Sequence, residues 1–259
     1  MGNDKVRAKK HLGQHFLKDR NIAAAIVDSL KADDCDTVLE VGPGMGVLTE
    51  FLVKRNFRCL KVVEVDSESV EYLNRNVSGI DEIIYGDFLA LDTPGLCIEK
   101  MAVIGNFPYN ISSQIFFKII ENRSIVSEVT GMVQKEVAER ICSLPGTRVY
   151  GILSVLLRAW YDIKYLFTVN ENVFSPPPKV KSAVIRLVRN DVDKLGCDER
   201  LFITVVKQCF NQRRKMIRNP IKALIRADAP EMPLLTSRAE QLSVEQYVML
   251  TNWVEQNRK

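Results

Sequence analysis

The chain has 259 residues, of which 46% are hydrophobic and 26% are charged, and its formal net charge at pH 7 is +4. This composition is typical of a globular protein and excludes disordered and fibrous chains. The length fits one large domain, or one domain with a smaller appendage. No apolar run approaches the ~18 residues of a membrane span and no signal peptide is visible, so we expect a cytoplasmic protein with no membrane partner.

Histidine and cysteine usage limits the chemistry available to the chain. The two histidines, His11 and His15, are too few for a histidine-based metal cage, and they make a Ser-His-Asp triad improbable. The six cysteines are scattered without a C-x-x-C pair, which favours free thiols in a reducing compartment. We therefore expect no metal site.

The first half of the chain alternates between two patterns. Residues 1–20 form a basic arm, and apolar spacing after Asn21 predicts a helix over 21–31 with Asn21 as its cap. Short β-branched runs then predict buried parallel strands, and the segments between them predict helices, as in a doubly wound α/β sheet. The expected strands cover 37–42, 59–66 and 101–106, with later ones at 128–136 and 182–188, and the expected helices cover 47–55 and 69–77.

Prolines mark a change in the second half. Ser175 is followed by three prolines at 176–178, which cannot occupy a central strand or a helix interior and therefore indicate a surface turn or linker. After Val188 the pattern is helical to the C-terminus, with three further prolines as breakers. We therefore expect a sheet-containing domain over 1–190, which includes the arm, and a small all-helical domain over 191–259.

A glycine-rich turn follows the first expected strand. Gly42, Gly44 and Gly46 open a helix, so the backbone can turn sharply and a ligand can approach without meeting a Cβ atom. A dinucleotide fingerprint requires glycine at position 47, where this chain has Val47. The G-x-G-x-G pattern after Glu40 suits a nucleoside ligand without a pyrophosphate better, which favours S-adenosylmethionine over NAD.

Two acidic residues extend this predicted site. Glu64 ends the second strand, where its carboxylate can accept both ribose hydroxyl protons, and Asp87 follows a third strand, where it can accept from the adenine amine of the cofactor. Each feature alone is equally well explained by a structural role. Together they lie at the carboxyl ends of successive strands, where open α/β sheets bind ligands, and they predict a Rossmann-like S-adenosylmethionine-dependent methyltransferase fold.

The segment NFPYN at 106–110 follows another buried strand. An adenine amine is a poor nucleophile because its lone pair is delocalised into the ring, and two acceptors that hold its hydrogens can turn that lone pair toward a methyl group. The side-chain oxygen of Asn106 and the backbone carbonyl of Phe107 or Pro108 can supply them, while proline stiffens the loop. Tyr109 offers a flat face for stacking on an extruded base. A simple turn explains the motif alone equally well, but its position beside the cofactor turn favours a catalytic role.

These motifs resemble, along nearly the whole chain, those of the small-subunit (16S) rRNA adenine dimethyltransferases, the kasugamycin-resistance methyltransferase family. The resemblance implies dimethylation of two adjacent adenines in the 3′-terminal hairpin loop of small-subunit rRNA, within a late pre-30S particle, and we expect a monomer. The motifs that carry it are KKHLGQHFLKD (9–19), EVGPGMGVLT (40–49), VEVD (63–66), GDF (86–88), GNFPYNISS (105–113), QKEVAER (134–140), FSPPPKV (174–180) and FNQRRKMIRN (210–219).

The resemblance also implies roles for individual residues. It places Phe174 beside the target base, and this chain departs from the family pattern at His15, where asparagine is frequent, and at Lys181, where an acid is usual. The cofactor contacts that it implies fall on His15, Leu17, Gly42, Glu64, Asp87 and Asn106.

A basic segment near the C-terminus predicts an RNA-binding surface. Eight Lys or Arg residues and no acid lie between positions 200 and 227. We expect Arg213, Arg214, Lys215 and Arg218 to span two helical turns and to contact phosphates, which makes affinity strongly salt dependent. A solvated helix face is the alternative, and the lack of interleaved acids disfavours it.

Other functions stay open at this point. The nearest enzymatic rival is a macrolide-resistance methyltransferase of large-subunit rRNA, which the FNQRRKMIRN segment disfavours. A noncatalytic RNA-binding assembly factor on the same fold is disfavoured by the intact cofactor residues, and a nicotinamide oxidoreductase is the remaining option. For the basic arm, an RNA contact and a disordered tail are equally good interpretations of its cations, which are Lys5, Arg7, Lys9 and Lys10.

Overall fold

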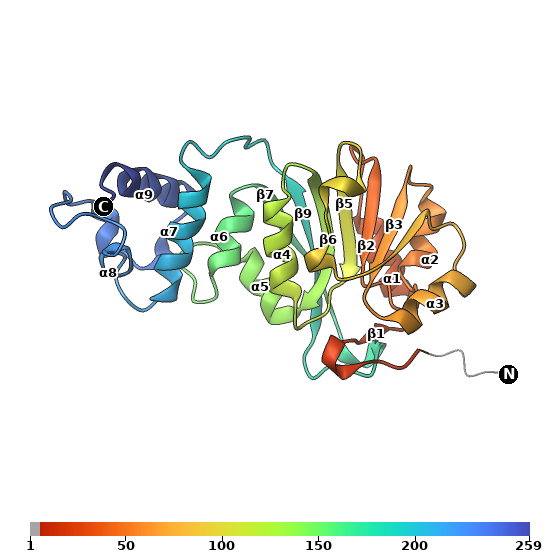
Figure 1. The fold of residues 1–259 in the computed structure, drawn as a ribbon. Helices are drawn as coiled ribbons and strands as arrows, with labels where there is room; N and C mark the ends of the chain where they lie inside the picture. The colour runs from red at the N-terminus through yellow and green to blue at the C-terminus, as the bar shows by residue number, and fades with distance from the viewer. Residues whose placement is uncertain (1–5) are drawn as a thin grey trace. The chain divides into compact units, whose positions relative to one another are not determined.

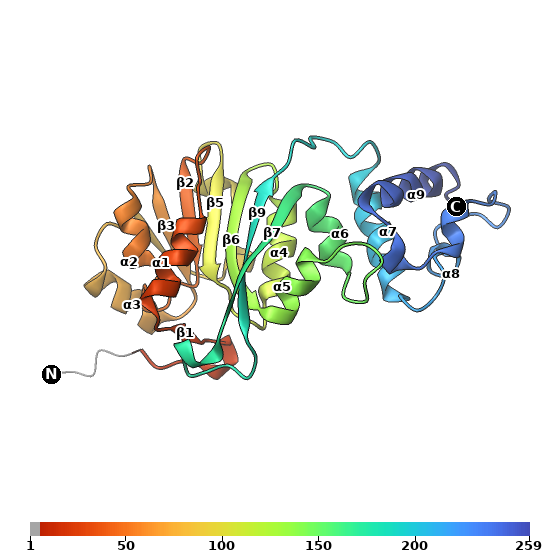
Figure 2. The ribbon, with the colours of Figure 1, turned by 180° about the vertical axis from the view of Figure 1, so that it is seen from behind.

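The computed structural model describes residues 6–259, so Lys5 of the basic arm lies outside the described residues. The chain divides into two compact units, and each is taken by itself (Figures 1 and 2). The first unit contains the chain as far as Ala138 together with Ile163–Arg189, and the second contains Glu139–Asp162 with Asn190–Lys259.

A seven-stranded sheet in the order β4-β3-β2-β5-β6-β9-β7 organises the first unit. The strand pairs β4-β3, β3-β2, β2-β5 and β5-β6 are parallel, and the pair β6-β9 is antiparallel. The predicted doubly wound, mostly parallel sheet is therefore confirmed. The strands are β2 (Thr37–Val41), β3 (Leu60–Glu64), β4 (Glu82–Tyr85), β5 (Met101–Asn106), β6 (Val126–Gln134), β7 (Tyr161–Val169) and β9 (Ser182–Arg189).

Helices cover both faces of this sheet, with α4 in front of it in Figure 1 and α1 in front of it in Figure 2. All five residues of β2 are buried, which is why the central strands read as continuous apolar runs. The helices of this part of the chain are α1 (Arg20–Ser29), α2 (Thr49–Leu52), α3 (Ser67–Asn76), α4 (Ser112–Glu121) and α5 (Lys135–Cys142).

Two predicted helix boundaries are wrong. α1 begins at Arg20 and its cap is Asp19 rather than Asn21, because the Asp19 carboxylate accepts from the backbone N–H groups of Asn21 and Ile22 at 2.9 and 3.2 Å. The helix predicted over 47–55 is one short α-turn, α2, continued by a 3-10 turn over Val53–Arg55.

A second, two-stranded sheet joins the basic arm to the proline-rich turn. β1 (Phe16–Leu17) pairs antiparallel with β8 (Phe174–Ser175). Phe16 and Leu17 of the arm are therefore attached to the first unit by backbone pairing, which a disordered tail would not show.

The second unit is built from helices around a set of aromatic rings. The ring centroids of Phe202 and Trp160 lie 5.9 Å apart, and Phe210 lies 6.3 Å from both Tyr150 and Tyr247. These contacts explain why residues 139–162, expected in the first domain, belong to the helical unit. Its helices are α6 (Ile152–Arg158), α7 (Glu199–Asn211), α8 (Arg218–Ile221) and α9 (Val244–Gln256). No helix of the described chain is long and apolar enough to cross a membrane.

Candidate active site

A cleft lies at the carboxyl edge of β2, β3 and β5, where the arm passes over the sheet. Its empty volume is about 450 Å³, with the open solvent at its mouth included. Its lining comes from the glycine-rich turn, the end of β3, the NFPYN segment and the arm, and includes Gly42, Gly44, Glu64, Val65, Asn106, Tyr109, Gln14 and His15.

The glycine-rich turn requires glycine for its backbone conformation. Gly42, Gly44 and Gly46 have φ values of 69°, 56° and 78°, in the left-handed region that side chains with a Cβ atom disfavour. A Cβ atom on Gly44 would also lie 2.7 Å from the ring of Phe16 on the arm. The turn therefore presents bare backbone to the cleft, as a nucleoside ligand would need.

Glu64 is held rigidly at the end of β3. Its carboxylate accepts from the backbone N–H groups of Gly44 at 3.0 Å, Val65 at 2.9 Å and Asp66 at 3.0 Å. Burial raises the pKa of Glu64, and the three backbone donors offset part of that rise. The side chain is thus a fixed acceptor in the cleft.

Asn106 is oriented by the arm. Its side-chain nitrogen Nδ2 donates to the backbone carbonyl of His15 at 2.9 Å. Because a carbonyl can only accept, this contact fixes which end of the amide faces the arm. The oxygen Oδ1 is therefore directed away from His15 and is available as an acceptor.

The NFPYN loop is anchored by the ring of Phe107, which is fully buried. A Cβ atom on Gly131 or on Gly105 would lie 2.4 or 2.9 Å from that ring, so these two glycines form a slot for it. The Phe107 N–H donates to the Met132 carbonyl at 3.0 Å, and the Pro108 carbonyl accepts from the Ile111 N–H at 3.2 Å. The loop is therefore fixed to the sheet.

Tyr109 lies between the cleft and a second, larger groove. Its ring centroid is 5.3 Å from that of His15, its hydroxyl forms a hydrogen bond with Ser182, and burial raises its pKa, so it is a neutral phenol near pH 7. The groove has about 920 Å³ of empty volume, and its lining includes Lys10, Tyr109, Gln134, Pro176, Pro177, Pro178 and Lys179. His15 Nδ1 lies 2.8 Å from the Pro176 carbonyl and must donate to it, which joins the arm to the proline-rich turn.

Three of the residues predicted to contact the cofactor or the target base lie outside the linings of the cleft and the groove. Asp87 is exposed and accepts from the backbone N–H of Leu89 at 2.9 Å. Leu17 is 4% exposed and packs in the core, but it also lines a third hollow together with Gly42 and Asn106. Phe174 is 1% exposed and belongs to the same core, because the pairing of β8 with β1 holds it there. The structure thus places Phe174 in the core, and its contact with a target base stays a prediction.

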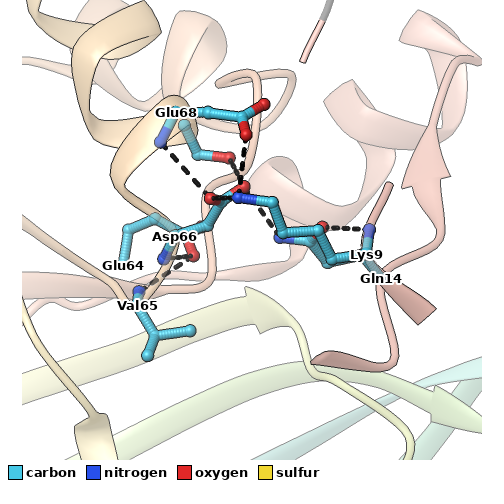
Figure 3. A network of polar contacts seen from close by, with 7 residues as sticks. Lys9, Gln14, Glu64, Val65, Asp66 and Glu68 are labelled. Atoms are coloured by element: carbon cyan, nitrogen blue, oxygen red, sulfur yellow. Dashed lines mark hydrogen bonds and ion pairs between the residues drawn. The ribbon is translucent and has the colours of Figure 1, made fainter. Parts of the chain in front are cut away.

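The structure adds residues that the sequence did not single out. Asp66 forms an ion pair with Lys9 (Figure 3). Gln134 lines the groove beside Tyr109. An acid followed by serine at a strand-to-helix junction is a helix-cap signal, and Asp66 indeed caps α3. Its ion pair with Lys9, 57 positions away in the sequence, carries no local signal.

The basic segment of the second unit does not form the predicted helix. α7 ends at Asn211, and a turn that contains Arg213, Arg214 and Lys215 precedes α8, which starts at Arg218. The Lys215 N–H donates to the Gln212 carbonyl at 2.7 Å, which closes this turn. We refer to residues 212–218 as the basic turn.

The cations of the basic turn differ in their contacts. Arg213 lies 3.6 Å from the carboxylate of Glu240 and donates to the backbone carbonyl of Arg148. Arg214, Lys215 and Arg218 are exposed. An acid distant in the sequence thus neutralises Arg213, although no acid is interleaved locally. Across residues 6–259, no cluster of His, Cys, Asp and Glu side chains could hold a metal ion.

Comparisons with known proteins identify the family of the chain. A family model described as ribosomal RNA adenine dimethylase matches residues 5–256. Proteins named ribosomal RNA small subunit methyltransferase A are similar to the chain: that of Bacteroides thetaiotaomicron is 58% identical, covering 97% of this chain and 95% of the relative, and that of Cytophaga hutchinsonii is 54% identical, covering 96% and 98%.

Solved structures show the same fold. A dimethyladenosine transferase from Plasmodium falciparum aligns with a TM-score of 0.75 at 23% identity, over 93% of this chain and 98% of that one. The 23S rRNA methyltransferase ErmE aligns with a TM-score of 0.69 at 26% identity, over 93% and 99%. From the match along almost its whole length, the chain belongs to the ribosomal RNA adenine dimethylase family.

Proposed function

We propose that this protein dimethylates the N6 amines of two adjacent adenines in the 3′-terminal hairpin loop of small-subunit rRNA. The methyl donor is S-adenosylmethionine, and the substrate is a pre-30S particle that the enzyme meets in the cytoplasm as a monomer. The observation that carries the proposal is the Asn106 amide, which the His15 carbonyl orients at the rim of a cleft that also contains Glu64.

The cleft fits the cofactor. Bare backbone at Gly42 and Gly44 admits a nucleoside, and the buried Glu64 carboxylate can accept both ribose hydroxyl protons. Asp87, exposed after β4, can accept from the adenine amine of the cofactor through the carboxylate oxygen that does not receive the Leu89 N–H. When bound, the cofactor supplies an electrophilic methyl group.

The chain contributes acceptors rather than a strong base. Asn106 Oδ1 holds one hydrogen of the target amine, and a backbone carbonyl of the loop holds the other. The Phe107 carbonyl is favoured for this, because that of Pro108 already accepts from Ile111. The nitrogen loses its proton only as the methyl group arrives and makes it acidic, so the scarcity of histidine is no obstacle.

Tyr109 and the groove beside it form the site of the target base. The ring of Tyr109 can stack on an extruded adenine, an interaction worth ~1–3 kcal/mol. With Phe174 buried in the core, Tyr109 is the stacking residue of this proposal.

The helical unit binds the RNA backbone through the basic turn. Arg214, Lys215 and Arg218 are exposed and contact phosphates, while Arg213 also stabilises the unit through Glu240. Base recognition and phosphate contacts are thus assigned to different residues, as in most nucleic-acid interfaces.

Mass spectrometry of ribosomal RNA provides the test. Small subunits that lack the modification are incubated with the protein and labelled cofactor, and a digest is searched for dimethylated adenines. The expected result is labelling of two neighbouring adenines near the 3′ end. Labelling of large-subunit RNA instead would favour the macrolide-resistance activity, and RNA binding without labelling would favour a noncatalytic assembly factor.

A further inference from the structure

The arm contacts both halves of the proposed site. Near its start, the Lys9 ammonium pairs with the Asp66 carboxylate and lies 3.1 Å from that of Glu68 (Figure 3). Six residues later, the His15 carbonyl receives the Asn106 amide. One short segment therefore connects the turn after β3 with the loop after β5.

Asp66 is the fixed point of this connection. Its side chain is fully buried, and besides Lys9 it accepts from Gln14 Nε2 at 3.4 Å, the Ser69 hydroxyl at 3.0 Å and the Glu68 N–H at 3.3 Å. Burial alone would raise the pKa of Asp66, but the bonds from Lys9, Gln14 and Ser69 bring it below its usual value. The carboxylate is therefore ionised near neutral pH and holds its partners by charge-assisted bonds.

The same network stiffens the arm between its two contacts. Gln14 Oε1 accepts from the Lys9 backbone N–H at 2.8 Å, so the side chain of Gln14 bridges the arm and Asp66. Gly13 turns the chain with φ of 66°, and a Cβ atom there would lie 2.6 Å from the Asn110 side-chain oxygen. The His15 carbonyl is thus held from two sides, by the attachment at Asp66 and by the pairing of the next residue, Phe16, with Ser175.

We propose that Lys9 and Gln14, acting through Asp66, are positioning residues that hold the arm so that the His15 carbonyl keeps Asn106 Oδ1 facing the substrate amine. This role rests on the proposed methyl transfer and deepens it. The Asp66 N–H also donates to Glu64, so the attachment of the arm and the ribose acceptor share one turn of backbone. Lys9 is therefore assigned to the geometry of the reaction, not to RNA.

Steady-state kinetics of Lys9→Met tests the proposal, because methionine keeps the length of the side chain and removes its charge. We expect kcat to fall by about 10- to 100-fold, since small displacements of a reacting group are that costly. The KM for RNA and the salt dependence of RNA binding should stay unchanged. Lys9→Arg should restore most of the rate. Arg75→Met is the matched control. Arg75 forms an exposed ion pair with Glu71 within α3, and this pair does not involve the arm.

A double-mutant cycle separates positioning from a general loss of stability. Lys9→Met and Asp66→Asn should be strongly non-additive in kcat, because both remove the same attachment. Because Asp66 is buried, Gln14→Leu serves as a second variant if Asp66→Asn fails to fold, and a fall in kcat without a change in melting temperature is expected for it.

Two outcomes would overturn the inference. Normal kcat for Lys9→Met, with an inactive Asn106→Ala, would refute the role of the arm and leave the proposed function intact. A raised KM for RNA and a shallower salt dependence at normal kcat would assign Lys9 to RNA binding instead. Full turnover by Asn106→Ala would by contrast refute the proposed mechanism itself.

Discussion

The cleft of the sheet unit and the basic turn of the helical unit, the two ligand sites proposed for this protein, are built in opposite ways. In the cleft, Glu64 receives three backbone donors and Asn106 is oriented by a backbone carbonyl, so the positions of the acceptors are set before a ligand arrives. In the basic turn, Arg214, Lys215 and Arg218 are exposed side chains on an irregular backbone. The first arrangement suits a reaction that depends on geometry, and the second suits phosphates whose exact positions vary.

The largest effect is expected where geometry matters most. Asn106→Ala removes the oriented acceptor, and kcat should fall by at least about 10²- to 10³-fold, as for the loss of a single oxyanion-hole donor. Affinity for S-adenosylmethionine should stay within about tenfold, because the interaction acts mainly in the transition state. Labelled methyl incorporation and calorimetry measure the two quantities. Near-normal turnover would mean that the preset position of Asn106 in the cleft does not matter for the reaction, and the comparison with the basic turn would fail.

Glu64→Gln tests the part of the cleft that is proposed to bind the ribose of the cofactor before the reaction. Loss of charge-assisted bonds to the ribose should weaken cofactor binding by about 10- to 100-fold, or ~1.5–3 kcal/mol. RNA binding at fixed salt should not change. Calorimetry with the cofactor and filter binding with RNA distinguish these effects, and equal losses of both ligands would indicate that the substitution disturbs the fold.

A smaller and more graded effect is expected in the basic turn. Replacing Arg214, Lys215 and Arg218 by alanine should weaken RNA binding and reduce the slope of log affinity against log salt by about 0.7 for each lost phosphate contact. Arg213→Ala should alter the slope less and lower the melting temperature more, because Arg213 is already paired with Glu240. An unchanged slope for the triple variant would show that these cations do not meet the RNA.

A separate effect, on stability rather than on turnover or binding, concerns Glu40, which is buried on β2 just before the glycine-rich turn. Burial raises its pKa to about 8, although the Thr49 hydroxyl donates to it at 2.6 Å. The folded protein therefore retains a proton that the unfolded chain releases near pH 4.5, so this contribution to stability is lost as pH rises between those values.

Glu40→Gln should remove that dependence. Its free energy of unfolding, relative to the unsubstituted protein, should rise with pH by up to ~1.4 kcal/mol per unit. Urea unfolding at about pH 5.5 and pH 8 measures it, and parallel pH profiles would mean that Glu40 is ionised in the folded protein.

The fold and the family could be predicted from the sequence because their signals are local. Continuous apolar runs identified β2, β3 and β5. The spacing of the glycines at 42, 44 and 46, which have left-handed φ values in the structure, identified the turn between β2 and α2. The strand-end position of Asn106 followed from the same pattern. Each of these features depends on neighbours along the chain.

The features that could not be predicted depend on segments distant in the sequence. Phe174 is buried because β8 pairs with β1, which lies more than 150 positions earlier, and Arg213 is neutralised by Glu240. The helix expected through the basic turn is interrupted by a bridge between Met216 and Arg238. The ion pair between Lys9 and Asp66 is a further long-range contact of this kind, because nothing in the sequence around either residue indicates its partner.

The glycine slot around Phe107 has a consequence for attempts to redesign this enzyme. Gly105 and Gly131 are interior positions of β5 and β6, and a stability screen would treat them as ordinary packing sites. A Cβ atom at Gly131 would enter the space of the buried ring, whereas one at Gly105 would also lie 2.4 Å from the backbone carbonyl of Val41 on β2. Under the proposed mechanism, a larger residue at position 131 will therefore displace the loop that carries Asn106, and it will change the rate of methyl transfer before it changes affinity for the cofactor.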